Sequence, residues 1–319
     1  MYTYPHYTLA MKENAPMVEF NNELISTLDL KFRGVPGAIA SYLIPHNQGA
    51  ALVECGPGST IPVLQAQLGE HGFTPADITD VLLTHIHLDH AGAAGWFAQQ
   101  GARIHVHPIG APHLLNPEKL LSSAARIYGE QMGLLWGEFL PVIESHLVVH
   151  EDQDLIAIEE LTFQALETPG HASHHFAYLL DGVCFSGDIG GVRMTGARHL
   201  RLPMPPPEFQ PNEWRQSLDI LRQQIITHIL PTHFGIFSDI DWHLDAIERA
   251  LDDVEAWMEK FMPRELPPEE LKREFLEWEA ERSQFDKIEA DYQAVYQTAN
   301  PVEISLLGIQ RYWKKYRQD

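Results

Sequence analysis

Between about Val18 and Phe237, short β-rich runs that end at glycine or proline turns alternate with a few helical segments. This alternation is typical of layered α/β structure, in which strands bury apolar faces against helices or a second sheet. After Asp239 the composition shifts to charged, helix-forming residues with apolar side chains at helical spacing. The sequence therefore predicts an α/β domain over residues 1–238 and a helical C-terminal extension over residues 239–319.

The expected elements follow from period-two and helical spacing of apolar residues. Expected strands cover residues 41–45, 51–55, 81–83, 161–166, 176–180, 183–186 and 225–230. Expected helices cover residues 61–68, 91–100, 244–261, 271–278, 288–296 and 306–316. The proline-rich stretch 203–211 is predicted to be an extended surface segment.

A helical insertion of about residues 109–145 interrupts the strand rhythm. Leu121, Tyr128, Met132 and Leu135 recur on one apolar helical face. One interpretation is a helix pair that covers the core, which is favoured because apolar stripes usually mean packing. The other is a lid or pocket wall.

Four candidate metal ligands follow the buried strand 81–83 within six positions: His85, His87, Asp89 and His90. Alternation along an extended chain places His85 and His87 on one side, and the next turn can direct the other two at a second point. One loop can therefore supply ligands to two metal ions. Imidazole with carboxylate suits Zn(II), with Fe or Mn as alternatives, and the absence of thiolate ligands argues against a closed structural zinc site.

The motif H-x-H-x-D-H formed by these residues resembles the hallmark of the metallo-β-lactamase superfamily. The chain also has the later ligands of that family in the expected order, each after a strand: His171 in Thr168-Pro169-Gly170-His171, Asp188 in Phe185-Ser186-Gly187-Asp188, and His233 in Pro231-Thr232-His233. The resemblance covers roughly residues 18–237. It implies an α/β fold, the four-layer αββα metallo-β-lactamase sandwich, with the catalytic site at one edge of two sheets.

The resemblance also implies the ligand roles. His85, His87 and His171 would hold the first of two divalent metal ions, Asp89, His90 and His233 would hold the second, and Asp188 would bridge them. The metal pair would lower the pKa of a bridging water, so that hydroxide attacks an electrophilic carbonyl or phosphorus near neutral pH. Asp89 is the expected catalytic residue, because it can pass a proton to the leaving group.

The leading prediction is an enzyme, a binuclear metal-dependent hydrolase that cleaves a carboxylic thioester, ester or lactone. An aspartate at position 188 without a cysteine ligand differs from zinc β-lactamases that use thiolate, and resembles the glyoxalase-II-like and lactonase-like branch. The alternatives are a phosphodiesterase or nuclease of the same fold, a redox enzyme, and a non-enzymatic metal-binding scaffold. For the redox reading, residues 239–319 are too short to hold a flavin domain.

Several polar residues near these motifs have two interpretations. Glu54 ends a strand where the family more often carries aspartate, and it either orients a ligand histidine or faces water. Arg193, His199 and Arg201 either meet an acidic substrate group or are solvated at the surface. Five other histidines and Cys184 are predicted to be structural. The five histidines are His105, His107, His174, His175 and His228.

The net charge of −22 indicates a small-molecule substrate and no nucleic acid partner, because nucleic acid binding depends on phosphate neutralisation. Cys55 and Cys184 are the only cysteines, and nothing in the sequence requires them to pair, which fits a reducing compartment. Residues 1–17 lack the pattern of a leader peptide, and the sequence has no apolar run long enough to predict a membrane span. We therefore expect a cytoplasmic protein, whose aromatic helices are compatible with a homodimer.

Overall fold

The computed structural model describes residues 17–20 and 23–318. The expectation that residues 1–17 lack a leader concerns a stretch that, except for Met17, lies outside the described residues. Across the described part of the chain, no helix combines the length and apolar character needed to cross a membrane.

Two β-sheets form the centre of the molecule. Among the described residues, one sheet has seven strands in the order β1-β2-β3-β4-β5-β6-β7, and the other has five in the order β12-β11-β10-β9-β8. The first sheet is antiparallel from β1 to β4 and parallel from β4 to β7. The strands are β1 Met17–Phe20, β2 Glu23–Asp29, β3 Ala40–His46, β4 Gly49–Val53, β5 Ile78–Leu82, β6 Arg103–Val106, β7 Leu147–Val149, β8 Leu155–Ile158, β9 Leu161–Glu167, β10 Phe176–Leu180, β11 Val183–Phe185 and β12 His228–Leu230.

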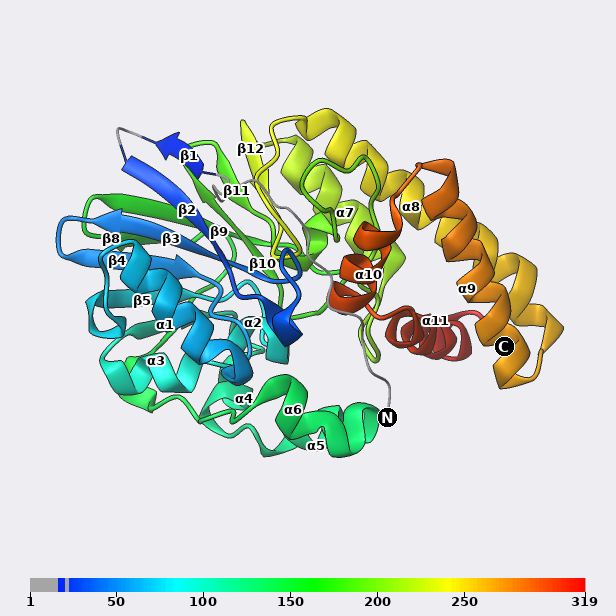
Figure 1. The fold of residues 1–319 in the computed structure, drawn as a ribbon, viewed down its shortest axis with the longest axis horizontal. Helices are drawn as coiled ribbons and strands as arrows, with labels where there is room; N and C mark the ends of the chain where they lie inside the picture. Colours follow the sequence, from blue (N-terminus) through cyan, green and yellow to red (C-terminus); the bar gives the residue numbers. More distant parts are fainter. Residues whose placement is uncertain (1–16, 21–22, 319) are drawn as a thin grey trace.

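Helices cover both outer faces of the paired sheets. Figure 1 shows α1 and α3 on one side of the sheets, with α7 and α8 on the opposite side. The helices are α1 Ile61–Glu70, α2 Leu88–Ala91, α3 Ala94–Gln100, α4 Ala111–Leu115, α5 Glu118–Tyr128, α6 Met132–Trp136, α7 Pro211–Arg222, α8 Ile240–Phe261, α9 Pro268–Phe285, α10 Ala290–Ala299 and α11 Val302–Tyr316. The predicted αββα sandwich, with helices inserted after β6 and a helical C-terminal region, is confirmed.

The two faces of β10 show how a strand of an inner layer packs on both sides. Phe176 and Tyr178 are buried in the core between the sheets, whereas Ala177 between them joins the second apolar cluster, which α7 and α8 cover. Successive side chains of a strand point to opposite faces, so one strand contributes to both cores. Cys184 of β11 is also fully buried in the second cluster and is unpaired, which confirms its predicted packing role.

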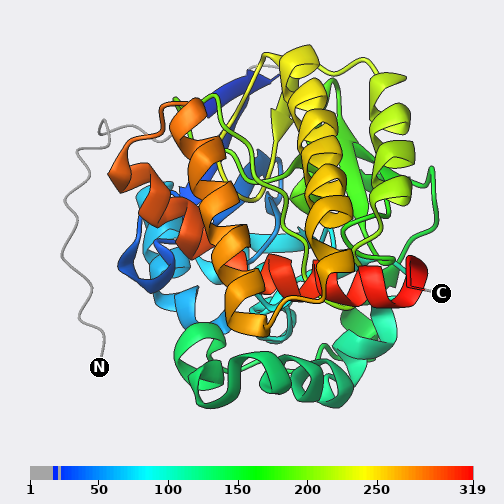
Figure 2. The same cartoon turned by 90° about the vertical axis from the view of Figure 1, so that its right-hand side faces the viewer.

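The C-terminal helices extend the second cluster. Leu271 and Phe275 of α9, together with Ile309 and Tyr312 of α11, are buried in it. Figure 2 shows α11 crossing the ends of α8 and α9. The predicted division of the chain at residue 238 stays a prediction.

The proline-rich stretch 203–211 lies only partly at the surface. Pro207 is exposed, but Pro203, Met204 and Phe209 are buried, and the backbone of Met204 lies directly beneath α11. The prediction of a surface segment was wrong for the buried residues, because the composition of the stretch carries no sign of the helix that covers them.

Arg193, His199 and Arg201 are buried and fit neither of the two interpretations. Arg193 forms a bidentate pair with Asp239, at 2.7 and 2.9 Å. His199 and Arg201 pair with two acidic residues of the C-terminal region, Asp286 at 2.6 Å and Glu279 at 3.3 Å. These contacts attach the loop after Asp188 to the C-terminal helices.

Candidate metal centre

The seven predicted ligands converge at the carboxyl ends of four strands. The loop with His85 and His87 follows β5, His171 follows β9, Asp188 follows β11 and His233 follows β12. Because β11 and β12 are parallel neighbours, the segments that leave them start at the same edge of the sheet. Asp188 itself lies in the 3₁₀ turn Gly187–Gly190. The strand order thus brings candidate ligands that are far apart in the sequence close together in space.

His85, His87 and His171 form the first triad, in which one nitrogen of each ring points to a common centre. His87 Nδ1 lies 2.9 Å from His85 Nε2 and 2.9 Å from His171 Nε2. The three atoms all lie within 4.8 Å of one another. This spacing allows one cation to contact all three nitrogens.

Asp89, His90 and His233 form the second triad, again within 4.8 Å. Asp89 Oδ2 lies 3.5 Å from His233 Nε2 and 3.8 Å from His90 Nε2. The sequence predicted both triads, and the structure brings the members of each together.

Asp188 lies between the two triads and faces each with a different oxygen. Its Oδ2 is 3.3 Å from His171 Nε2 and 4.0 Å from His85 Nε2. Its Oδ1 is 3.4 Å from both His90 Nε2 and His233 Nε2. A carboxylate in this position can contact two cations at once.

Backbone carbonyl groups fix the tautomers of two ligands. His171 Nδ1 donates to Pro203 O at 2.8 Å, and His233 Nδ1 donates to Ala38 O at 2.7 Å. A carbonyl oxygen only accepts, so Nδ1 carries the proton and the Nε2 lone pair faces the triad.

Glu54 is fully buried and supports a ligand of each triad. Its Oε1 accepts a short hydrogen bond from the Thr84 hydroxyl, which leaves the Thr84 oxygen to accept from His85 Nδ1 at 3.1 Å. The same Oε1 lies 3.2 Å from His90 Nδ1, on the side of that ring turned away from Asp188. Of the two interpretations of Glu54, the orienting role fits this geometry and exposure to water does not.

The carboxylates divide the histidines into two electrostatic groups. Burial lowers the pKa of His171 to about 4 and holds that of His85 well below its usual range, where the neighbouring imidazoles add to the effect. Burial also opposes the charge on His90 and His233, but Asp188 and Asp89 outweigh it and raise the pKa of both rings.

The pKa values of the two carboxyl groups shift in the opposite direction. Burial alone would raise the pKa of Asp89, but the adjacent His90 and His233 lower it to about 2. His90, His171 and His233 likewise hold the pKa of Asp188 well below its usual range. Both carboxyl groups are therefore ionised near neutral pH.

The donor set fits divalent cations. Among the described residues, His90 Nε2 and Asp188 Oδ1 are buried without a hydrogen-bond partner. Such orphaned buried groups are costly unless something else satisfies them. His90 Nε2 and Asp188 Oδ1 border the second triad, where a cation would satisfy both.

The other histidines lie outside the two triads. His105 Nε2 bonds Asp80 at 2.7 Å, so its place is in a buried ion-pair network of the first sheet. His174 stacks on His85 with ring centroids 6.0 Å apart, and its Nε2 lies 3.6 Å from Glu208. His175 Nδ1 bonds the Thr168 hydroxyl at 2.9 Å.

Apart from Glu54, sequence reasoning missed the groups that hold the candidate ligands in place. Thr84 precedes His85 directly, so its position next to the motif was a usable signal. Trp214 of α7 had none: it is fully buried, its indole N–H donates to Ile189 O at 3.0 Å, and its ring lies 6.0 Å from that of His171.

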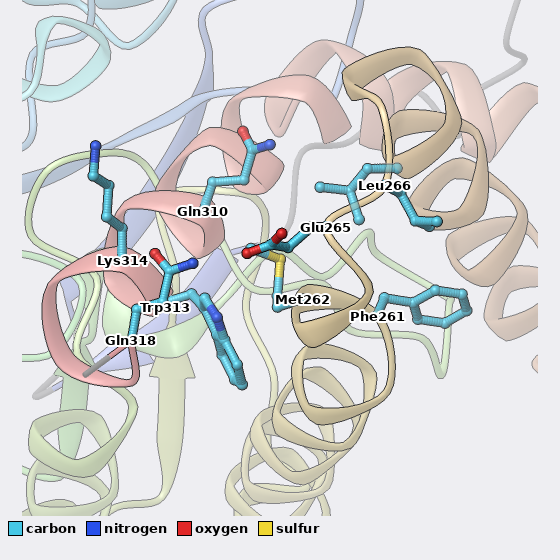
Figure 3. Close-up of a pocket in the computed structure, with 9 residues that line it drawn as sticks. Phe261, Met262, Glu265, Leu266, Gln310, Trp313, Lys314 and Gln318 are labelled. Carbon is cyan, nitrogen blue, oxygen red and sulfur yellow. The ribbon is translucent and has the colours of Figure 1, made fainter.

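A surface cavity of about 210 Å³ lies away from this centre, where α8, α9 and α11 meet. Figure 3 shows the side chains around it. It shares no lining residue with the two triads or Asp188, and its lining residues are Phe261, Met262, Glu265, Leu266, Leu271, Gln310, Trp313, Lys314 and Gln318.

Comparison with known proteins agrees with this architecture. A family model described as the metallo-β-lactamase superfamily matches residues 34–233, which is more than half of the chain. Among solved structures, an archaeal metallo-β-lactamase superfamily protein from Sulfolobus tokodaii aligns with a TM-score of 0.62 and 18% identity, over 90% of this chain and 98% of that one. A metallo-β-lactamase family protein from Thermus thermophilus aligns with a TM-score of 0.62 and 20% identity, over 87% of this chain and 88% of that one.

Curated relatives match over shorter stretches. A hydroxyacylglutathione hydrolase of Xanthomonas campestris pv. campestris is 34% identical over 161 residues, which cover 50% of this chain and 50% of that protein. A metallo-β-lactamase fold-containing protein of Sulfurisphaera tokodaii is 26% identical over 149 residues, which cover 46% and 55%. The chain thus spans about half the length of the curated relatives it matches.

Proposed function

The chain belongs to the metallo-β-lactamase superfamily, and from this we propose that it is a metal-dependent hydrolase that cleaves a carboxylic thioester, ester or lactone. The observation that carries the proposal is the arrangement of two ligand triads that share Asp188, with one carboxylate oxygen facing each. Two adjacent cation positions with a shared carboxylate are typical of a catalytic two-metal site and not of a closed structural site.

In this proposal His85, His87 and His171 hold one divalent cation, Asp89, His90 and His233 hold the other, and Asp188 contacts both. Imidazole and carboxylate donors favour zinc, with iron or manganese as alternatives. Two such cations, when bound, supply Lewis acidity and lower the pKa of water toward neutrality.

Asp89 is the residue we propose to move the proton. Its carboxylate is ionised near neutral pH and its side chain is 21% exposed, against 4% for Asp188. Asp89 Oδ2 can therefore accept a proton on the open side of the centre and deliver it to the leaving group. Asp188 has both oxygens directed at the triads and is less suited to this role.

The inserted helices supply a candidate wall of the substrate pocket. Tyr128 at the end of α5 packs edge-on against Trp136, which stacks on Phe32. Burial raises the pKa of the Tyr128 phenol, and the negative charge of Asp89 raises it further, as expected of a ring on the side of the centre where Asp89 lies. We therefore favour the pocket-wall interpretation of residues 109–145 over a purely core-covering helix pair.

The substrate class rests on charge and on the relatives. Hydroxyacylglutathione hydrolases are thioesterases, and one of them is 34% identical over half of this chain. The net charge of −22 disfavours polyanionic nucleic acid and favours a small molecule. The buried, unpaired Cys55 and Cys184 are consistent with a reducing, cytoplasmic setting.

The test is a hydrolysis panel with the purified full-length protein after zinc, iron or manganese loading. The panel contains a thioester, an aliphatic lactone, an aryl ester, a β-lactam and a phosphodiester. We expect turnover of the thioester, ester or lactone, and loss of turnover after chelation. Cleavage of the phosphodiester alone would contradict the proposal, and metal binding without any turnover would favour a metal-binding scaffold.

A further inference from the structure

The carbonyl of Pro203 accepts the hydrogen bond that sets the tautomer of His171, 32 positions earlier in the chain. Pro203 has no backbone N–H and makes no regular strand pairing, so its position depends on the residues beside it. Both neighbours, Leu202 and Met204, are 2% exposed. What holds these two residues therefore holds the oxygen beneath His171.

Asn300, which caps the end of α10, and Ser305, in the first turn of α11, hold both neighbours. Asn300 Nδ2 donates to Leu202 O at 3.0 Å, and the Met204 amide donates to Ser305 Oγ at 3.4 Å. The Ser305 hydroxyl donates to Asn300 Oδ1 at 3.0 Å, which joins the two side chains into one unit. Asn300 is 7% exposed and Ser305 is 2% exposed, so water competes little for these bonds.

Gly308, one turn along α11, brings the helix backbone against the same segment. A Cβ at position 308 would lie 1.9 Å from Met204 O and 3.0 Å from the carbonyl carbon of Pro205. This contact leaves no room for a side chain. The segment around Pro203 is therefore held against α11 by close backbone contact as well as by hydrogen bonds.

We propose that Asn300, Ser305 and Gly308 are positioning residues of the first triad. Through Leu202 and Met204 they hold the Pro203 carbonyl under His171 Nδ1, and so keep the His171 Nε2 lone pair directed at the centre. The inference rests on the proposed function only in taking this triad as a metal site. The C-terminal helices thereby become part of the metal centre without contributing a ligand.

Cobalt(II) binding to the metal-free full-length protein tests this, followed by visible absorption in competition with a chelator. We expect Asn300→Ala and Ser305→Ala to weaken one of two cobalt equivalents by about 10-fold and to change its absorption. This is the lower end of the effect of changing a direct partner of a ligating histidine, because the two residues act through Pro203. The second equivalent keeps its wild-type affinity. A His171→Gln reference identifies which equivalent belongs to the first triad.

Two matched variants serve as controls. Thr298→Ala removes a hydroxyl of α10 that bonds only within the helix, to Ala294 O, and should bind both equivalents normally. Gly308→Ala should weaken the same equivalent as Ser305→Ala, whereas Gly69→Ala in α1, where a Cβ meets nothing within 4 Å, should not. If Asn300→Ala fails to fold, Ser305→Ala decides the question, because it deletes a single hydroxyl.

Unchanged cobalt binding in folded Asn300→Ala and Ser305→Ala would overturn the inference, and so would equal weakening of both equivalents. Wild-type protein that binds two equivalents but hydrolyses nothing contradicts the proposed function and leaves the inference standing. Wild-type protein that binds no cobalt overturns both.

Discussion

The two triads differ in how the chain supports them. In the second triad, His233 donates to Ala38, two residues before β3, and His90 lies beside Glu54, which follows β4 directly. In the first triad, His171 donates to an irregular segment that the last helix covers. The second triad is thus supported by residues that lie next to strands. The first triad depends in addition on the C-terminal end of the chain.

The triads also differ in charge. The first has three imidazoles, and burial keeps the pKa of His85 and His171 low. The second includes the carboxylate of Asp89, and the pKa of His90 and His233 is raised. Asp188 faces both triads directly, so changes at Asp188 should affect the two positions together.

The largest expected effect is that of Asp188→Ala. Removing the carboxylate deletes a contact to both positions, and His90 and His233 lose a negative charge that raises their pKa. We expect loss of both metal ions and a fall in hydrolysis of more than about 100-fold. Metal content by mass spectrometry and turnover measure this, with Asp219→Ala on the surface of α7 as the control. Full activity with both metals retained would rule out a bridging role.

The next effect is that of Glu54→Gln, which keeps the shape of the side chain but removes its charge. Because Glu54 contacts Thr84 and His90, one change reaches a ligand of each triad. We expect both metal affinities to fall by about 10- to 100-fold. Chelator competition measures this, with the exposed Glu277→Gln as the control. Weakening confined to one position would show that Glu54 serves a single triad.

The smallest expected effect is a difference in pH dependence. A histidine with a raised pKa stays protonated to higher pH, so protons compete with the cation there at higher pH than at a histidine with a lowered pKa. As pH falls, metal should leave the second triad before the first, by on the order of one pH unit. Equilibrium dialysis against cobalt(II) at stepped pH would detect it. Loss from the first triad first would reverse the electrostatic comparison.

The strands around the site were predictable because their signals are local. The apolar run 81–83, the glycine after α3 and the turn before β11 can all be read within a few residues. The ligands were predictable for a related reason, since four of the seven lie in one hexapeptide. The burial of Pro203, Met204 and Phe209 was not predictable, because a proline-rich sequence has the same composition whether a helix covers it or water does.

Arg193 shows the other limit of local reasoning. Its sequence context is compatible with solvent or with a substrate anion, and its actual partner, Asp239, lies 46 positions away. Stacking of its guanidinium on Phe237 and Trp242, at 4.0 and 4.3 Å, likewise requires the fold to be known. The same holds for Trp214 and for the residues that support Pro203.

The sequence by itself determined the layered α/β structure and the ligand cluster at residues 85–90, because strand periodicity and ligand chemistry are properties of short stretches. The sandwich architecture and the three later candidate ligands followed from the resemblance to the metallo-β-lactamase superfamily. Only the tertiary structure decided which nitrogen of each histidine faces the centre, and that Glu54 is buried beside it. It also decided that the C-terminal helices reach the first triad. These features arise from contacts between residues far apart in the chain, and a hydrogen-bond partner selected by folding leaves no local mark in the sequence.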